Sequence, residues 1–503
     1  MNNGNFWGQK KTIVAIAVSI LALVEIIDLT IITVALPDIM GALSVNINEV
    51  SLTMTSYIIA AAVFMPLTGI ISKKYGTKNL ILASAVLFGI SSILCGMATN
   101  LFAMVVFRIM QGVGGAFLPA LAQAYIVDNF NSKEQPKIMT VYSLCLIMGP
   151  VLGPILGGYI VQHMSWRWIF YINVPLCIVG FILVYLLMDE TKKENVSTDY
   201  ISFLFMVIGV GCLEFFLDEG NQNSWFESKP LVIVLLIGVL STVFFIWRGI
   251  LGKSVVNFQI FKDKNFNFAC LLVFCFMITV ILSLAYFPTW LQQGYSYPVD
   301  LAGYITAPRG VCAFIAAPLF IILAKYIDQR VVIFIGLVVF MLSNVVLCTF
   351  GVNQNPNLIL FTMLLQGIGL TGTFIMMLQC AFSNMATHLT NDATGVFNFF
   401  RNIGNSVGTS IAATLISREQ QISWHDMGNH ITLSNPNFLH WSNMFPNAPL
   451  ELKVKIASAV IQQQSFLIAN LDAVMASLIT SMFILWIPFA LSKPKPGASP
   501  MMH

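Results

Sequence analysis

The 503 residues carry little charge: only 9% are Asp, Glu, Lys or Arg, whereas 57% are hydrophobic and the mean hydropathy is +0.82. Soluble domains carry about 25% charged residues, so the composition excludes a chain of soluble domains and predicts a polytopic membrane protein. The formal net charge of +3 is small and scattered, which gives no reason to expect nucleic acid as a partner.

The nine cysteines all fall in apolar stretches, and their spacing does not suit zinc. Buried membrane cysteines behave as small hydrophobic residues, so we expect neither disulfides nor a metal site. The sequence contains no nucleotide-binding Gly-x-x-x-x-Gly-Lys-Ser/Thr motif and no Ser/His/Asp cluster. We therefore expect no cofactor and no enzyme, and an ion gradient rather than ATP as the energy source.

Apolar stretches long enough to cross a bilayer, which takes about 20 residues, occur fourteen times in the chain. The first is too long for the core of a signal peptide, so we expect it to remain as the first span. The spans are 12–36, 51–73, 79–98, 101–127, 139–163, 168–188, 200–218, 230–249, 266–291, 301–325, 331–351, 357–384, 394–416 and 472–491.

Most Lys and Arg residues of the connecting loops fall on one side of the membrane if the N-terminus is cytoplasmic. Because positive loop residues stay in the cytoplasm, both termini are predicted to be cytoplasmic. The connection 417–471, rich in Asn, Gln, His and Trp, is then an extracytoplasmic loop.

The first span carries Glu25 and Asp28, which lie three residues apart on one helical face. Charges inside spans are costly and invite a functional interpretation. A carboxyl shielded from water titrates closer to neutral pH, so Asp28, and Glu25 as the second candidate, could load and release protons. The alternative is a static ion pair with Arg108 or Arg401.

The connection after the second span contains Gly69, Lys73, Lys74, Gly76 and Lys78. A tight basic turn is what the topology alone requires on the cytoplasmic side. The same residues could also hold helix ends together and lock one gate of the protein.

Arginines stand inside three later spans. Arg108 precedes Gln111 deep in the fourth span, and because arginine stays charged it would tune or hold a carboxylate rather than carry a proton. A fixed bridge between two helices is the alternative. Arg401 opens the thirteenth span and, like Gln111, is a candidate for substrate binding or gating, with snorkelling of Arg401 to the interface as the alternative.

Arg309 follows Pro308 within the tenth span, well away from its outer edge, and is a candidate for substrate binding or gating. Glu214 and Asp218 lie in or near the end of the seventh span. Since Asp218 precedes Glu219-Gly220 at the predicted outer edge, a solvated turn explains it more simply than a site.

The fifth span contains the stretch Gly149–Gly158. Its glycines at 149, 153 and 157 stack on one side of a helix, and prolines at 150 and 154 form a second stripe beside them. Gly158 ends the stretch. A kinked membrane helix with a bare face for close packing is predicted, although small residues at this spacing also occur in ordinary membrane packing.

An internal repeat is visible in the sequence. Gln111-Gly-Val-Gly recurs as Gln366-Gly-Ile-Gly, and the glycines of the fifth span recur as Gly404, Gly408 and Ala412, whereas its prolines do not. We predict two six-helix halves of the same orientation, 1–190 and 258–503, with a two-helix insert at 191–257. Such halves around a central path are the architecture of a major-facilitator transporter, an all-α membrane fold.

Over nearly its whole length the chain resembles the fourteen-span drug:proton antiporters of the major facilitator superfamily, the EmrB/QacA type. The match rests on stretches similar to its signatures: Asp28–Pro37, Arg108 with Gln111-Gly112, Gly149–Gly158, Trp166–Pro175, Asp218-x-Gly220 with Trp225-Phe226, and Arg401–Ser410. The resemblance implies a partnership with a periplasmic adaptor and an outer-membrane channel. Ser72 departs from the signature Asp of the loop, and Glu25 and Arg309 lie outside the signatures.

The hypothesis is proton-coupled efflux of drugs or other amphipathic organic compounds across the bacterial inner membrane by alternating access. Asp28 would be the leading proton-linked residue, tuned by Arg108, and Gly149–Gly158 the close-packed helix about which the halves rock. One alternative is a dedicated exporter of a metabolite or siderophore, with Arg309 meeting an anionic group. The other is a non-transporting membrane receptor.

Overall fold

The computed structural model describes residues 3–131, 134–190, 193, 199–252, 254–352, 354–432, 434–445 and 449–491. Within these ranges the chain is entirely helical, as predicted. The α-helices are α1 (Asn3–Leu43), α2 (Ile47–Phe64), α3 (Thr68–Tyr75), α4 (Thr77–Met97), α5 (Leu101–Asn129), α6 (Gln135–His163), α7 (Trp168–Tyr171), α8 (Asn173–Leu187), α9 (Tyr200–Glu219), α10 (Lys229–Ile250), α11 (Lys264–Leu284), α12 (Phe287–Thr289), α13 (Val299–Tyr326), α14 (Gln329–Leu347), α15 (Pro356–Phe382), α16 (Thr390–Gly428), α17 (Pro436–Asn443), α18 (Leu450–Ile484) and α19 (Ile487–Ala490). Short helical turns join some of them: η1 (Met65–Leu67), η2 (Trp225–Glu227), η3 (Phe258–Lys262), η4 (Trp290–Gly294) and η5 (Thr387–Leu389).

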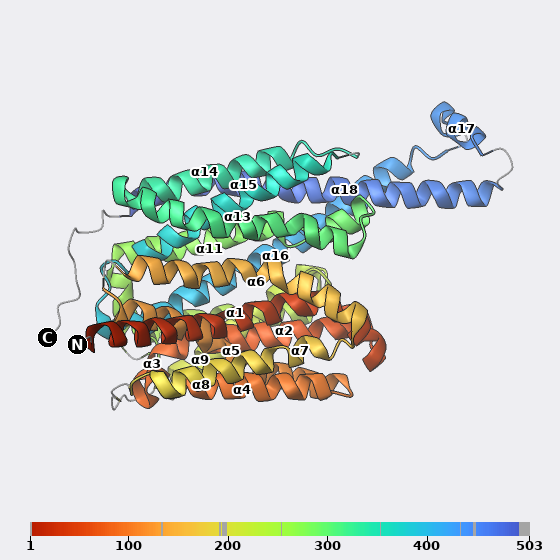
Figure 1. Ribbon diagram of the computed structural model, residues 1–503. Helices are drawn as coiled ribbons and strands as arrows, with labels where there is room; N and C mark the ends of the chain where they lie inside the picture. Colours follow the sequence, from red (N-terminus) through yellow and green to blue (C-terminus); the bar gives the residue numbers. More distant parts are fainter. Residues whose placement is uncertain are drawn as a thin grey trace.

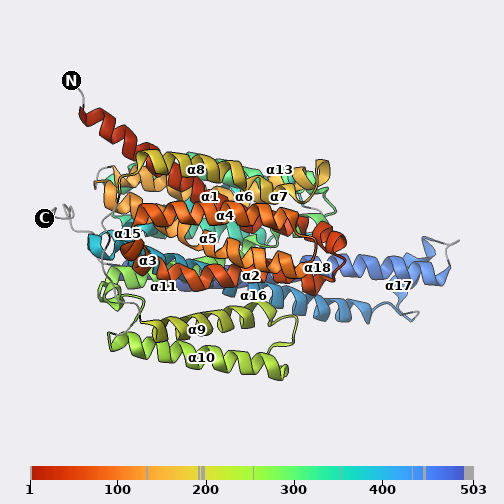
Figure 2. The same ribbon diagram turned by 90° about the horizontal axis from the view of Figure 1, so that it is seen from below.

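Twelve of the described helical stretches are long and apolar enough to cross a membrane, and α6 is a thirteenth if its two bent parts form one span. The remaining expected span, 394–416, lies inside α16. Asn, Ser, Thr and Gly residues lower the hydropathy of this helix, yet it runs through the bundle beside the other helices (Figure 2). The structure is thus compatible with fourteen spans.

Polar caps set where several helices begin. Asn46 accepts a hydrogen bond from the Glu49 backbone N–H, and the Glu49 side chain accepts one from the Asn46 N–H, both at 2.9 Å. This reciprocal pair satisfies free donors at the start of α2. Between α3 and α4, Gly76 has a φ of 88°, a left-handed conformation that favours glycine. The turn predicted around Gly76 therefore has a backbone reason for its glycine.

The helices form two side-by-side groups, α1–α8 and α11–α19 (Figure 1). We call them the first and second halves. Within the first half α1 packs against α5, α6 and α8, and α13 of the second half reaches across to α6. The inserted helices α9 and α10 lie together at one edge of the bundle (Figure 2).

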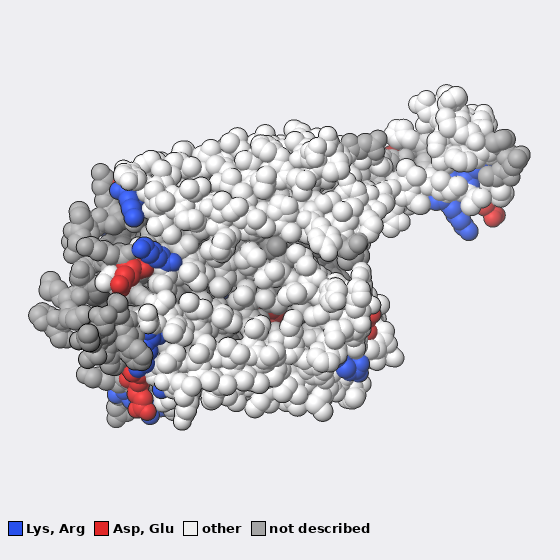
Figure 3. Space-filling model, in the orientation of Figure 1, with Lys and Arg blue, Asp and Glu red and all other residues white. Residues whose placement is uncertain are grey.

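Charged side chains gather at the ends of the molecule, while the long middle of the visible face carries almost none (Figure 3). Large apolar side chains of the long helices are exposed, for example Leu240 of α10 and Phe314 of α13, which are 68% and 64% exposed. A soluble protein would hide such residues, whereas lipid tails solvate them. The chain is a multi-pass membrane protein.

The connection 417–471 is largely helical rather than an irregular loop. α16 continues to Gly428, α17 follows, and α18 begins at Leu450. Together they project beyond the end of the bundle opposite the start of α1 (Figures 1 and 2). The segment contains several Leu, Ile, Gln and Ala residues that permit helix, so the two flanking spans extend into it as a hairpin.

Candidate functional site

The small-residue face of α6 packs directly against α1. A Cβ atom added at Gly149 or Gly153 would collide with Ile26 or Thr30, and one at Gly157 would lie 3.0 Å from Ile31 Cγ1. The Thr30 hydroxyl donates a hydrogen bond to the Gly149 carbonyl at 3.2 Å. These glycines therefore let the two backbones approach closely.

The proline stripe of α6 lies away from this contact. Pro150 is exposed, and Pro154 and Gly158 are partly buried. The two parts of α6, Gln135–Pro150 and Leu152–His163, meet at an angle of 44°. Because proline removes a backbone donor and its ring crowds the preceding turn, the bend falls where the sequence predicts a kink.

Asp28 of α1 is fully buried and surrounded by donors. Arg108 of α5 pairs with its Oδ2 at 2.6 Å. Its Oδ1 accepts hydrogen bonds from the side-chain amides of Gln111 at 2.8 Å and Asn173 at 2.7 Å. Three donors on one carboxylate form strong hydrogen bonds, so this network fixes Asp28 of α1 against α5 and α8.

The remaining contacts of Arg108 are also buried. Its Nε donates to the Thr53 carbonyl at 2.9 Å, and its Nη1 donates to Gln111 Oε1 at 2.7 Å. The guanidinium lies over the Tyr57 ring, 4.3 Å from its centroid, a favourable cation–π arrangement. Gln111 in turn donates to Ser92 at 2.8 Å. The structure thus contains an ion pair between Asp28 and Arg108. This pair is the alternative to a proton-binding site at Asp28 that the sequence also allowed.

Sequence reasoning missed three members of this network, namely Tyr57, Ser92 and Asn173. Tyr57 and Ser92 are polar side chains inside the apolar helices α2 and α4, and Asn173 is the first residue of α8. A polar residue in an apolar stretch is a signal that the sequence contains. Which polar side chains meet depends on how the helices are rotated against each other, and that information is tertiary.

Glu25 lies one turn from Asp28 but in a different setting. The residue is 1% exposed, and neither of its carboxyl oxygens has a hydrogen-bond partner among the described residues. A Cβ atom added at Gly115 would lie 3.3 Å from Glu25 Cγ and 2.5 Å from the Tyr57 hydroxyl, which is also unpartnered. The opposite charge that acts on Glu25 belongs to Arg401 of α16, in the second half.

Arg401 is 7% exposed and lies near Tyr142 of α6 as well as Glu25. Snorkelling to an interface would leave its guanidinium in water, whereas here it is buried between the halves. The structure therefore separates the two predicted acids: Asp28 pairs with Arg108 inside the first half, and Glu25 faces Arg401 across the seam.

The basic turn after the second span binds the second half. Lys73 of α3 forms an ion pair with Asp392 of α16, and Gly69 packs so closely on Asp392 that a Cβ atom there would collide with it. Lys78 donates to the Met188 carbonyl at 2.6 Å, and Lys74 lies 5.5 Å from the Tyr75 ring centroid. Asp392 is a partner that the sequence analysis did not identify.

Arg309 stands apart from these groups. It is 6% exposed, its Nη1 has no hydrogen-bond partner, and no ion pair links it to any residue in the described part of the chain. Gly367 packs on the Arg309 carbonyl in the second half, just as Gly112 packs on the Tyr57 carbonyl in the first. Arg309 therefore occupies the position in the repeat that Tyr57 has in the first half.

Among the described residues, no three His, Cys, Asp or Glu side chains gather in a way that could hold a metal ion. The buried polar groups are instead carboxylates, amides, guanidiniums and hydroxyls. Of these, the carboxylates can exchange protons, whereas the guanidiniums stay charged.

Comparisons with known proteins agree with this picture. "Multidrug export protein EmrB" of Haemophilus influenzae is 28% identical, with 92% of each chain covered. "Probable multidrug resistance protein EmrY" of Escherichia coli is 30% identical, covering 87% of this chain and 85% of its own. The structure of the proton:xylose symporter XylE, only 13% identical, superposes with a TM-score of 0.59 over 95% of this chain and 96% of that one.

Two six-helix halves, buried ionic groups and these relatives point to one family. Residues 18–409 match the model of the family described as the Major Facilitator Superfamily. This match covers well over half of the sequence, and the chain therefore belongs to the Major Facilitator Superfamily.

Proposed function

We propose that the protein exports drugs or other amphipathic organic compounds across the bacterial inner membrane in exchange for protons, by alternating access. The family and the relatives named as multidrug export proteins support this function. The observation that carries the proposal is Glu25, a buried carboxyl without a hydrogen-bond partner at the seam between the halves.

Glu25, rather than Asp28, is the leading proton-binding residue in this proposal. Burying an ionised carboxylate that lacks donors costs free energy. Glu25 is therefore most stable when it binds a proton or when a cation lies beside it. Asp28 instead accepts hydrogen bonds from three side chains, those of Arg108, Gln111 and Asn173. Its role is then to fix α1 against α5 and α8, so that Glu25 is presented to the second half.

Exchange follows if a cationic or amphipathic substrate and a proton compete for the same carboxyl. When the space between the halves opens to the outside, Glu25 takes a proton and releases the substrate. When this space opens to the cytoplasm, the substrate replaces the proton at Glu25. The tight α1–α6 contact at Gly149, Gly153 and Gly157 makes these two helices move together.

The ion pair between Lys73 and Asp392 joins the halves at the end where α1 begins. We infer that this is the cytoplasmic end, with both termini inside. The positive loop residues of this end support the orientation. In the inward-open state this pair must separate.

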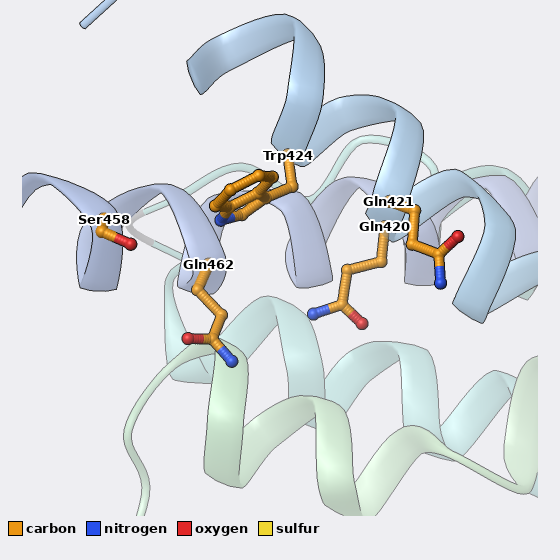
Figure 4. A pocket seen from close by; sticks show the side chains of 5 residues that line it. All are labelled: Gln420, Gln421, Trp424, Ser458 and Gln462. Carbon is orange, nitrogen blue, oxygen red and sulfur yellow. The ribbon is translucent and has the colours of Figure 1, made fainter.

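A periplasmic adaptor and an outer-membrane channel complete the proposal. The projecting hairpin of α16–α18 is the surface that would meet an adaptor. It holds a groove of about 360 Å³. Its lining consists of Gln420, Gln421 and Trp424 from α16 and of Ser458 and Gln462 from α18 (Figure 4). Amides and an indole N–H provide hydrogen bonds for a polar helix of a partner.

The test uses inside-out membrane vesicles with an acidic lumen and the fluorescent cation ethidium. We expect vesicles with the wild-type protein to accumulate ethidium, and vesicles with Glu25→Gln to accumulate at least tenfold less. Glu227→Gln, an exposed acid on η2, is the control. Unchanged gradient-driven uptake by Glu25→Gln would refute the coupling role of this residue.

A second candidate function rests on Arg309, whose charge is buried without an anionic partner among the described residues. A dedicated exporter of an anionic metabolite or siderophore would use it to bind the anionic group. Competition between ethidium and a lipophilic carboxylate, measured for wild type, Arg309→Ala and Arg309→Lys, separates the two. Selective loss of the carboxylate in Arg309→Ala, with partial recovery in Arg309→Lys, favours the anion exporter.

A further inference from the structure

The inserted helix α9 is bonded to both halves of the protein. The Thr55 hydroxyl of α2, in the first half, donates a hydrogen bond to Asp218 of α9. The Ser410 hydroxyl of α16, in the second half, donates to the Leu217 carbonyl at 2.5 Å. When the halves rock, the spacing of α2 and α16 changes, so at least one of these contacts must change with it.

Two carboxyl groups lie one helical turn apart at this junction. Asp218 is exposed near the end of α9, whereas Glu214, one turn deeper, is 1% exposed. Glu214 Oε1 has no hydrogen-bond partner among the described residues, and the Ser406 side chain of α16 lies beside the carboxyl. The acids therefore form a short path from the exposed Asp218 to a buried, incompletely bonded carboxyl.

No fixed cation compensates Glu214 in the described structure, which distinguishes it from Asp28. The helices that pack against α9 contribute hydroxyl groups, namely Thr55 of α2 and Ser406 of α16. Tyr286, which follows the end of α11, lies near Asp218. The charged side chains of α10 are Lys229 and Arg248, at its two ends. Asp218 is the titratable group that acts on Glu214, and it also acts on Glu219 at the outer end of α9.

The far end of α9 provides a contrast. There Asp199 accepts hydrogen bonds from Arg248 at 2.7 and 3.1 Å, and these hydrogen bonds lower the pKa of Asp199. That acid is a satisfied structural anion that fixes α10 to α9. Glu214, on the same helix, has no comparable partner and is placed where the halves meet.

We propose that Glu214 is a second proton-binding residue of the transporter, loaded from water through Asp218. A proton from water first binds the Asp218 carboxylate and then moves to the Glu214 carboxylate, so that one O–H bond breaks as the other forms. Separation of α2 and α16 admits water to Glu214 and releases the proton. The inserted helices thereby contribute to coupling, and this inference rests on the proposed proton exchange.

The first experiment detects the bound proton directly. Dicyclohexylcarbodiimide modifies protonated carboxyls in apolar surroundings, and peptide mass spectrometry locates the modified residue. In the purified full-length protein we expect modification at Glu214 that declines as the pH is raised. Asp218→Asn should slow this modification severalfold, since it removes the entry residue. Absence of label at Glu214 at all pH values would overturn the proposal.

The second experiment measures coupling in proteoliposomes with ethidium as the probe. Glu214→Gln should release at least twofold fewer protons per ethidium transported than wild type, and Glu214→Asp should recover part of the loss. Asp199→Asn, which keeps the helix cap, is the matched control and should retain wild-type coupling. Wild-type proton release by Glu214→Gln contradicts the inference. Wild-type protein that labels at Glu214 but shows no proton-driven uptake contradicts the proposed function instead.

Discussion

The side-chain amide of Asn398 in α16 donates a hydrogen bond of 2.8 Å to Gln123 Oε1 in α5, and both side chains are completely buried. This bond joins the two halves inside the bundle. A second polar contact, from Asn391 to Thr77 at 3.3 Å, lies closer to the end where α1 begins. Together with the Lys73–Asp392 ion pair they connect the halves on one side, which is the arrangement expected for a conformation closed at that end.

Replacing either partner of the Gln123–Asn398 bond should favour opening at this end. Asn398→Leu leaves the Gln123 amide buried without its partner, and an unsatisfied buried polar group costs about 1–3 kcal/mol. The double variant Gln123→Leu/Asn398→Leu removes both groups and should return toward wild type. Hydrogen exchange of α5 and α16, followed by mass spectrometry, measures the opening. Equal exchange in the single and double variants would show that the bond does not control the closed state.

The ion pair between Lys73 and Asp392 predicts a charge-swap result. Lys73→Asp alone places two carboxylates together, which should open this end and reduce gradient-driven ethidium uptake severalfold. The exchange Lys73→Asp/Asp392→Lys restores opposite charges at the same contact and should recover much of the uptake. Lys74→Asp is the control, because the Lys74 side chain lies over the Tyr75 ring and is not paired with Asp392. Failure of the swap to recover activity would mean that charge attraction is not what joins these helices.

Hydropathy and residue spacing predict much of the architecture. Long apolar stretches give helices in a bilayer because no other open structure satisfies the backbone, and the spacing of Gly149, Gly153 and Gly157 identifies the bare face of α6. The hydropathy signal is weaker for α16, where Asn402, Asn405 and Ser410 reduce it. This helix is polar because it meets other protein elements rather than lipid.

The pairing of charged residues could be anticipated only in part. The sequence offers Arg108 and Arg401 as alternative partners for the acids of α1, but the choice depends on the rotation of helices that are apolar on most faces. Lys73 and Asp392 are separated by most of the chain, so no local pattern connects them. Asn173 stands in a stretch of aromatic residues that suggests only a membrane anchor, and its bond to Asp28 depends on the packing of α8 against α1.

Neutralising Asp28 should destabilise the protein rather than simply alter its coupling. Asp28→Asn leaves Arg108 buried without its counter-ion, and breaking a buried pair in this way costs about 3–5 kcal/mol. A lower midpoint of thermal unfolding in detergent is expected. The double variant Asp28→Asn/Arg108→Gln removes both charges and should regain part of the stability. An unchanged midpoint for Asp28→Asn, together with altered pH dependence of transport, would instead identify Asp28 as a proton carrier.

The α1–α6 contact predicts which glycine tolerates a side chain. Gly153→Leu places a large group where even a Cβ atom would collide with Thr30, and overpacking of this kind costs about 1–3 kcal/mol or more. We expect the variant to insert into the membrane but to transport ethidium at least tenfold more slowly, because α1 and α6 can no longer move as a close-packed pair. Gly41→Leu on α1 is the matched control, since no heavy atom lies within 4 Å of its Cβ position. Membrane quantity measured by immunoblot separates failed insertion from failed transport. Wild-type uptake by Gly153→Leu would contradict a mechanical role for this contact.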